Sequence, residues 1–487
     1  MVAIRKGLIA ALMLGLLAGA AWLGQQAGAT VGAVAAQTVE VIEVGFASED
    51  LTPSLTEARR PVYVAGFGHN RKATGVHDPI MARTVVLKEG DKKIALVSLD
   101  IVGYFHAEVV KVRERLPDFH YVLVTSTHNH EGPDTLGLWG PSPVVSGVDP
   151  AYLEFIANRV VASVRAAERN LKPAAAQIGV VQAPELLHDS REPRVLHDDL
   201  VVLRFHSSAG GVRPPLGLVV QWNCHPETMN SKNTELTADY VYFTIEYLRK
   251  KYDCPVVYLT GTVGGLMTSL HVPIKDEAGN LLKDGTWDKT RRYGELLGAA
   301  CDRALARAEP VRLTPMTVRA RQFTVAMTNP LYHLGRKLGV LKRDVYVWTG
   351  NPADLQPGDN KTPEDRMAVR TEVAALLLGE LHVACIPGEI YPELVLDKIQ
   401  DPVDPGADFP EAPKEPAIYP ALGGRWQMII GLANDQLGYI LPKRQWDEKP
   451  PFCYGRQKKQ YGEENSIGSD AAPTICGMFQ ELMRMPR

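Results

Sequence analysis

Short apolar runs alternate along the chain with longer stretches in which apolar residues recur at helical spacing. The short runs are rich in β-branched residues and predict strands at residues 84–87, 94–99, 121–124 and 200–203. The helical spacing predicts helices at residues 151–170, 240–251 and 292–308. Strands interleaved with helices indicate an α/β fold built from mixed α and β layers.

Two further segments have the composition of loops or turns that join helices and strands. Residues 401–420 are rich in proline and acidic side chains, which predicts a long exposed loop. The glycine-rich run 261–265 predicts a tight strand-to-helix turn, because it lacks the Gly-Lys-Ser/Thr ending of a phosphate-binding loop. The chain also lacks a G-x-S-x-G motif, which argues against a serine hydrolase.

The N-terminus has a different pattern from the rest of the chain. Arg5 and Lys6 precede an apolar run over residues 7–24, and small residues follow up to Ala36. This order predicts a secretory signal peptide over residues 1–36, with an uncleaved N-terminal anchor as the alternative. Under either interpretation the protein is exported to the periplasm or the extracellular space.

Composition narrows the class of protein. The chain has 487 residues with 53 basic and 56 acidic side chains, a net charge of −3, so it lacks the basic excess that binding to nucleic acid requires. Its 45% hydrophobic content is that of a folded globular protein and excludes a disordered one. The six cysteines include no C-x-x-C pair, and Cys453 with Cys476 is the candidate disulfide in the loop-rich tail.

The strongest candidate for chemistry follows the apolar run 121–124. His128 and His130 are separated by one residue, so on a strand both imidazoles would project from the same face. Gly132 and Pro133 then turn the chain, which places the pair at the end of a strand. Such a pair can address one metal ion or one substrate atom; the alternative is two surface histidines near a turn.

Four other residues are candidates for the same site. His225 ends an apolar run, and it is either a structural histidine or the third imidazole of a zinc site. Glu389 follows a Pro-Gly turn, where it is either a helix N-terminal carboxylate or an oxygen ligand. Tyr439 and Tyr461 lie among turn residues, where a tyrosine is usually half-buried packing with a solvated hydroxyl.

Taken together and in this order, these segments resemble the neutral/alkaline (non-lysosomal) ceramidase family, the zinc amidases that cleave the N-acyl bond of ceramide. The matching segments are residues 43–53, 65–68, 75–84 and 97–100, the His128/His130 motif, and the segment around Tyr461. The resemblance covers most of the mature chain. It implies one large catalytic domain over residues 37–487, without the C-terminal immunoglobulin-like domain of longer ceramidases.

The resemblance also implies a set of site residues and one zinc ion per chain. The implied zinc ligands are His128, His225, Glu389 and Tyr439. The implied catalytic residues are His130, Arg191, Tyr439 and Tyr461. In this scheme zinc-activated water attacks the amide carbonyl, His130 transfers the proton, and the tyrosines and Arg191 stabilise the negative charge on the oxygen.

This chain departs from the family pattern at several positions, so substrates other than ceramide are also considered. The family has T-H-T-H-S-G-P-G-G, whereas this chain has Asn129, Glu131 and Asp134, and the two acids predict a more acidic mouth. The alternatives are a zinc hydrolase of another amide or of an ester, and a non-catalytic exported binding protein on the same fold. The expected partner is an N-acyl lipid or small amide substrate, with membrane-surface association as an option and the oligomeric state open.

Overall fold

The apolar runs build two sheets in the computed structural model, which describes residues 42–57, 60–208 and 214–486. Within these residues the larger sheet has nine strands: β1 (Glu43–Asp50), β3 (Met81–Glu89), β4 (Lys92–Leu99), β5 (Tyr121–Ser126), β6 (Lys172–Gln182), β8 (Asp199–Ser207), β9 (Gly217–Trp222), β11 (Val256–Thr260) and β13 (Glu309–Val311). Their order is β11-β9-β8-β6-β1-β3-β4-β5, with β13 beside β6. The pairs β4–β5 and β9–β11 are parallel and the others antiparallel.

The smaller sheet has five strands in the described part of the chain: β14 (Met316–Ala326), β15 (Tyr346–Val347), β16 (Met367–Leu378), β17 (Leu381–Cys385) and β19 (Trp426–Ile430). Their order is β14-β16-β17-β19, with β15 beside β16 and a parallel β17–β19 pair. Among the described residues, three short strand pairs lie outside both sheets: β2 (Gly75–Val76) with β10 (Glu235–Leu236), β7 (His188–Asp189) with β12 (Met267–Thr268), and β18 (Glu389–Ile390) with β20 (Tyr439–Ile440).

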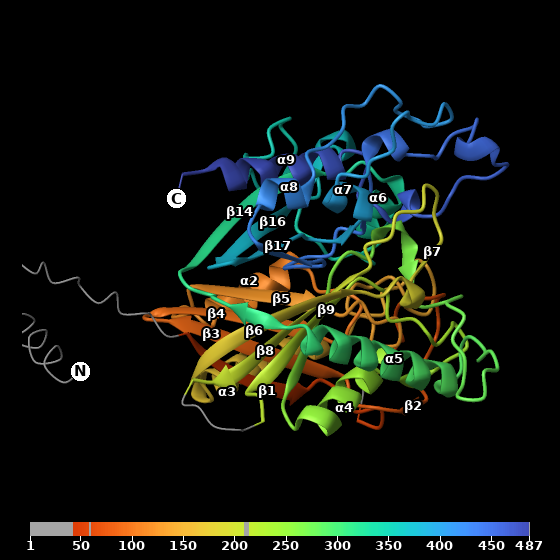
Figure 1. Ribbon diagram of the computed structural model, residues 1–487. Coiled ribbons are helices and arrows are strands. Elements are labelled where there is room, and N and C mark those ends of the chain that lie inside the picture. Colours follow the sequence, from red (N-terminus) through yellow and green to blue (C-terminus); the bar gives the residue numbers. More distant parts are fainter. Residues whose placement is uncertain (1–41, 58–59, 209–213, 487) are drawn as a thin grey trace, which may run out of the picture. The chain divides into compact units, whose positions relative to one another are not determined.

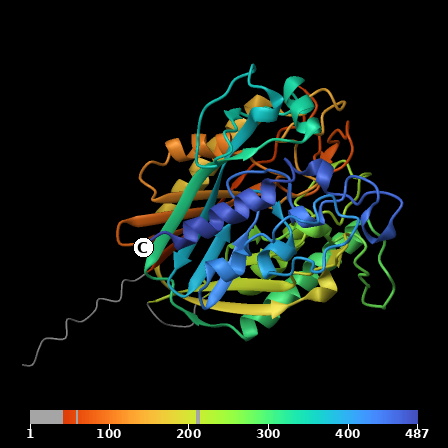
Figure 2. The same ribbon diagram turned by 90° about the horizontal axis from the view of Figure 1, so that it is seen from above.

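Helices cover the outer faces of both sheets. Those of the described residues are α2 (His106–Glu114), α3 (Pro150–Arg169), α4 (Tyr240–Tyr252), α5 (Trp287–Ala306), α6 (Pro330–Lys337), α7 (Pro392–Leu396), α8 (Ile418–Leu422) and α9 (Ala471–Arg484). Helices α3, α4 and α5 pack on the larger sheet, and α7, α8 and α9 pack on the smaller one (Figure 1). Figure 2 shows α9 lying across β14 and β16.

The two sheets face each other across an aliphatic core. Phe46 and Leu96 from the larger sheet belong to the same buried cluster as Leu376 and Val383 from the smaller one. Burying these apolar surfaces against each other removes them from water and holds the layers together. The result is a four-layer arrangement of helix, sheet, sheet and helix, and the predicted mixed α and β fold is confirmed.

Local sequence explains where the predicted helices begin. Asp149 caps α3 by accepting a hydrogen bond from the backbone N–H of Ala151 (3.0 Å), and Pro150 occupies the first helical position. The helix predicted over residues 292–308 begins five residues earlier, at Trp287, because Thr286 caps α5, and it ends two residues earlier, at Ala306. All four predicted strands lie within β3, β4, β5 and β8.

Two smaller predictions are wrong. The glycine-rich run after β11 leads into a single 3₁₀ turn at Gly264–Leu266 and then into β12, because the next helix begins only at Trp287. Cys453 and Cys476 are both free and buried, so this pair forms no disulfide. Each behaves as a small apolar side chain.

The predicted leader over residues 1–36 lies outside the described residues. Among the residues that the structure does describe, no helix combines the length and the apolar character needed to cross a membrane. Residues 40–487 cluster as one compact unit. A single unit is what the candidate site needs, because its residues come from both sheets.

Candidate metal centre

Strands of both sheets end at the candidate site and are tied to each other there. The Thr260 hydroxyl at the end of β11 donates to the carbonyl of Thr127, which follows β5 (2.8 Å). The backbone N–H of Gly431, after β19, donates to the Thr260 carbonyl (2.9 Å). Because these bonds fix the strand ends, the loops that follow β5, β9, β17 and β19 meet at one place.

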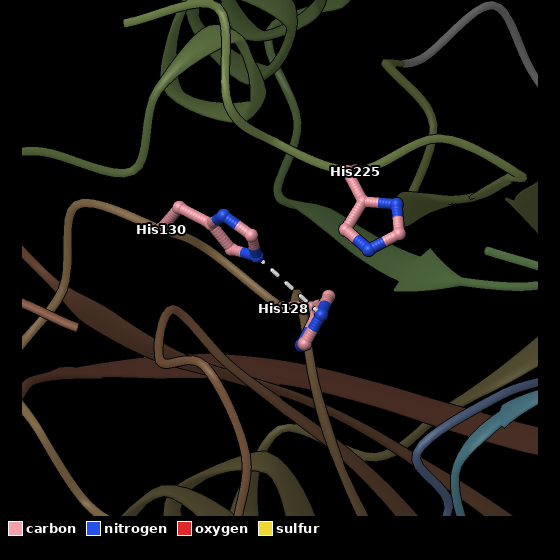
Figure 3. Close-up of side chains that lie close together, drawn as sticks. All are labelled: His128, His130 and His225. Carbon is pink, nitrogen blue, oxygen red and sulfur yellow. Dashed lines mark hydrogen bonds between the residues drawn. The ribbon is translucent and has the colours of Figure 1, made fainter. Parts of the chain in front are cut away.

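His128 lies just after β5 in a left-handed backbone conformation, with φ of 63°. A residue other than glycine is uncommon there, and such strain gathers at functional positions. The turn brings His128 and His130 together, with their Nε2 atoms 3.5 Å apart (Figure 3). The two rings therefore converge as predicted, but through a turn, since neither residue lies on the strand.

The rings of His128 and His225 are both oriented by backbone carbonyls. His128 Nδ1 lies 2.6 Å from the Val102 carbonyl oxygen, and His225 Nδ1 lies 2.8 Å from the Met267 carbonyl oxygen. A carbonyl can only accept, so each Nδ1 carries a proton and each Nε2 faces the centre, where it can offer a lone pair to a metal ion once that atom holds no proton. Metal-binding histidines are held in this way by groups behind the ring.

Glu389 completes a set of three atoms that face one point. Its Oε2 lies 3.2 Å from the Nε2 of His128 and 3.2 Å from the Nε2 of His225. Its Oε1 accepts a hydrogen bond from Gln436 Nε2 (2.8 Å). Burial would raise the pKa of Glu389, but the two imidazoles lower it well below the usual value, so the carboxylate is charged.

These atoms fit a metal ion by the chemistry of the donor set. Two imidazole Nε2 atoms and a carboxylate oxygen converge in a buried place, where either a proton on the rings or a metal ion between the three atoms balances the negative charge. Imidazole nitrogen and carboxylate oxygen are the ligands of catalytic zinc. The ligand atoms of His128, His130 and His225 also lie within 4.8 Å of one another.

The Nδ1 atom of His130 faces a carboxylate, whereas the Nδ1 atoms of His128 and His225 face backbone carbonyls. Its Nδ1 lies 3.2 Å from Glu227 Oε2, and the Thr268 hydroxyl donates to the other oxygen of Glu227. Burial lowers the pKa of His130 to about 4. Burial would raise the pKa of Glu227, but His130 and its other neighbours lower it to about 2. The pair is thus a neutral imidazole beside a charged carboxylate.

Tyr439 and Tyr461 lie on the same side of the centre. Tyr439 pairs in register with Glu389 in the parallel β18–β20 pair, and its ring centroid is 6.5 Å from that of His225. Burial raises the pKa of Tyr439 well above the usual value, so its phenol is neutral. Tyr461 is 49% exposed and its ring lies 6.0 Å from that of Tyr439, which places it at the solvent side.

Arg191 lies beside the centre, and both of its terminal nitrogens are occupied by protein groups. Its guanidinium forms a double hydrogen bond with Glu463 (2.9 and 2.7 Å). The same nitrogens donate to the carbonyls of Tyr461 (2.8 Å) and Gln445 (3.0 Å). Arg191 therefore holds the Tyr461 segment in place, and its implied contact with a substrate oxygen stays a prediction.

The two acids that predicted an acidic mouth are buried and paired. Glu131 has no exposed surface and lies 3.0 Å from Arg71 Nη1. The Asp134 carboxylate accepts hydrogen bonds from three backbone N–H groups, including that of Gly137 (2.7 Å). Neither contributes charge to the entrance, and the prediction of an acidic mouth is wrong.

Glu227 and Gln436 are site residues that sequence reasoning missed. Glu227 stands two residues after His225, so the signal was a carboxylate beside a candidate ligand. Gln436 is separated from Glu389 by 47 positions, and no local pattern links them. Only the folded chain shows that these side chains hold His130 and Glu389.

Comparison with known proteins supports the fold. No protein-family model matches the chain. Two solved structures are similar over 91% of it: a ceramidase complexed with C2 (TM-score 0.66, 15% identity, 75% of that chain) and the neutral ceramidase from Pseudomonas aeruginosa (TM-score 0.65, 16% identity, 74% of that chain). The chain shares their fold. The site residues implied by the sequence resemblance stay predictions.

Proposed function

We propose that this protein is a zinc-dependent amidohydrolase that cleaves the N-acyl amide bond of ceramide or a related N-acyl lipid. The observation that carries the proposal is the convergence of His128 Nε2 and His225 Nε2 on Glu389 Oε2, each 3.2 Å from it, in a buried place. The proposed ligands are these three residues and Tyr439. A bound zinc ion lowers the pKa of a water from about 16 to about 7 and polarises a carbonyl.

His130 is the proposed proton carrier. Its Nε2 faces the same point as His128 Nε2, and the neutral ring can accept a proton there. The proton then passes to the leaving nitrogen, which an amide needs before its C–N bond breaks. Glu227 holds the Nδ1 side of His130 and stabilises the ring while it is charged, as an orienting carboxylate does.

The two tyrosines are the proposed donors to the carbonyl oxygen. Their phenols stay protonated because burial raises both pKa values, so each offers an O–H when negative charge develops. A positioned donor of this kind typically contributes about 3–4 kcal/mol. Arg191 supports this arrangement through the Tyr461 carbonyl that it binds.

The amide class of substrate rests on the likeness to two ceramidase structures and on the sequence resemblance. Esters and other amides are the alternatives within the same chemistry. The test is to incubate the zinc-loaded chain with ceramides, other N-acyl lipids, short soluble amides and matched esters, and to quantify the freed acid. Release from amides that depends on zinc supports the proposal. A chain that binds zinc but cleaves none of them would be a binding protein.

Export also belongs to this proposal. Export is inferred from the predicted leader over residues 1–36. A substrate outside the cytoplasm would require export. Expression of the full chain with a reporter at its C-terminus would locate the protein. Retention in the cytoplasm would contradict export.

A further inference from the structure

Helix α6 turns its apolar side to solvent. Leu331, Leu334 and Leu338 recur at helical spacing and are 58%, 50% and 45% exposed, and none of the helix's own residues is buried. An ordinary surface helix places its leucines against the core and its charges outside. Exposed leucines on one face of a helix therefore indicate a surface that another apolar body covers.

Polar bonds hold α6 against the candidate site. On the inner side of the helix, the Tyr332 hydroxyl donates to the Asn465 carbonyl (3.1 Å). Asn329, which caps the helix, donates to the carbonyls of Glu464 (2.9 Å) and Ser466 (2.7 Å). Asn465 in turn donates to the Tyr461 hydroxyl (2.5 Å). The exposed leucines thus sit on the element that supports the Tyr461 side of the site.

The loop over residues 135–148 is a second apolar segment, and it touches the residues that follow α6. It contains no charged residue, and Val144 and Val145 are 53% and 47% exposed. Gly137 in this loop lies against the Val340 carbonyl so closely that a Cβ there would overlap it. The loop begins directly after the motif that contains His130, so it and α6 both adjoin the site.

The charges near these residues are mostly positive. Residues 330–344 contain Arg336, Lys337, Lys342 and Arg343 against one acid, Asp344. Arg343 is paired with Asp435 (2.6 Å), whereas Lys337 and Lys342 are exposed. Apolar side chains flanked by exposed lysines match a layer of acyl chains beneath anionic headgroups.

We propose that the α6 surface, formed by Leu331, Leu334, Leu338, Val144 and Val145 with Lys337 and Lys342, docks onto a lipid bilayer or micelle that carries anionic headgroups. This deepens and rests on the proposed function, because docking there would present an N-acyl lipid to the site from the aggregate that contains it. Apolar contact supplies most of the binding, and the two lysines add attraction that salt weakens.

The test is co-sedimentation with vesicles of phosphatidylcholine alone and of phosphatidylcholine with an equal part of phosphatidylglycerol. These lipids contain no amide, so binding is measured without turnover. We expect the full chain to bind the anionic vesicles and Leu331→Gln/Leu334→Gln/Leu338→Gln to bind them at least about tenfold more weakly. Lys337→Gln/Lys342→Gln should weaken binding about fivefold per lysine at low salt, on the anionic vesicles only.

Leu281→Gln is the matched control, because Leu281 is 66% exposed and lies outside α6 and the loop. It should bind as the unaltered chain does, and thermal unfolding checks that every variant is folded. No binding to either vesicle, or equal binding by the leucine variant, would overturn the proposal. A dimer in sedimentation velocity that the leucine variant abolishes would overturn it too, by assigning the surface to a second copy.

The two proposals can fail separately. Vesicle binding without cleavage of any amide would support the α6 docking proposal and contradict the proposed function. Cleavage of soluble amides without vesicle binding would support the proposed function and contradict the docking proposal. If both hold, the leucine variant should lose activity on vesicle-borne amides by the same factor as it loses binding.

Discussion

The metal centre and the Arg191 cluster are both buried and charged, but only the second contains a permanent positive charge. In the centre, two imidazoles face the Glu389 carboxylate, and each is positively charged only while it holds a second proton. In the cluster, Arg191 is surrounded by Glu463 and by the nearby carboxylates of Asp189 and Glu393.

This difference distinguishes the metal centre, which can bind a ligand, from the Arg191 cluster, which stabilises the fold. Arg191 makes four hydrogen bonds through its two terminal nitrogens, all of them to protein groups. Its charge is satisfied when the chain folds, whereas the centre needs either extra protons on its imidazoles or a metal ion to balance the carboxylate. Burial and charge alone do not identify a metal site; the direction of the lone pairs does.

The largest expected effect is the loss of catalysis in His128→Ala. Removing one lone pair leaves the centre without a full ligand set, so activity on the best amide should fall at least about a thousandfold, or more than about 4 kcal/mol. His120→Ala is the control, since His120 is exposed and lies on the other side of β5 in sequence. Steady-state kinetics measures both. Full activity in His128→Ala would remove the centre from the reaction.

A smaller effect, on stability, is expected in Arg191→Met. It leaves Glu463 buried without its partner, which should lower the free energy of unfolding by about 3–5 kcal/mol in urea denaturation. Arg191→Met/Glu463→Leu should recover most of this loss, because no charge is then stranded. If Arg191→Met instead abolished zinc binding at unchanged stability, the cluster would belong to the centre.

The pH dependence of stability should carry the signature of the same cluster. Burial raises the pKa of Glu393 to about 7, above its value in the unfolded chain. The protonated carboxyl therefore stabilises the fold fully below about pH 4, and this contribution is lost as pH rises through about 7. Glu393→Gln should flatten the decline between these values by roughly 2–3 kcal/mol in urea denaturation. An unchanged pH profile would mean that Glu393 is charged in the fold.

The smallest effect is expected at the edge of the centre, in Glu227→Gln. An amide cannot stabilise the charged ring of His130 as a carboxylate does, so kcat should fall about tenfold with KM nearly unchanged. Glu227→Asp should restore part of the rate, and Glu277→Gln, at an exposed loop position, should leave it intact. A higher KM at unchanged kcat would show that Glu227 contacts substrate and does not orient His130.

Much of the fold could be predicted from local patterns. Short runs rich in β-branched residues located the strands around residues 84–87 and 121–124, and helical spacing located the helix over 151–170, because both patterns lie within one element. The start of α5 was missed because the cap at Thr286, not the apolar spacing, decides it. The pairing of two sheets face to face depends on contacts between distant residues, and no local pattern contains them.

The candidate site could be predicted in part. His128, His225 and Glu389 each follow an apolar strand by a few residues, and this shared position was visible in the sequence, whereas their convergence was not. Their lone-pair directions depend on the carbonyls of Val102 and Met267, which come from other elements. The burial of Glu131 could not be predicted either, because its partner Arg71 is separated from it by 60 positions.

The most direct test of the central claim is a zinc titration of the metal-stripped chain by calorimetry. The convergence of three ligand atoms predicts one tight site per chain, with binding weakened at least about a hundredfold in His128→Ala, His225→Ala and Glu389→Gln. His120→Ala and the folded fraction of Arg191→Met should keep the site. No zinc binding by the unaltered chain, or equal binding by the three ligand variants, would contradict the account.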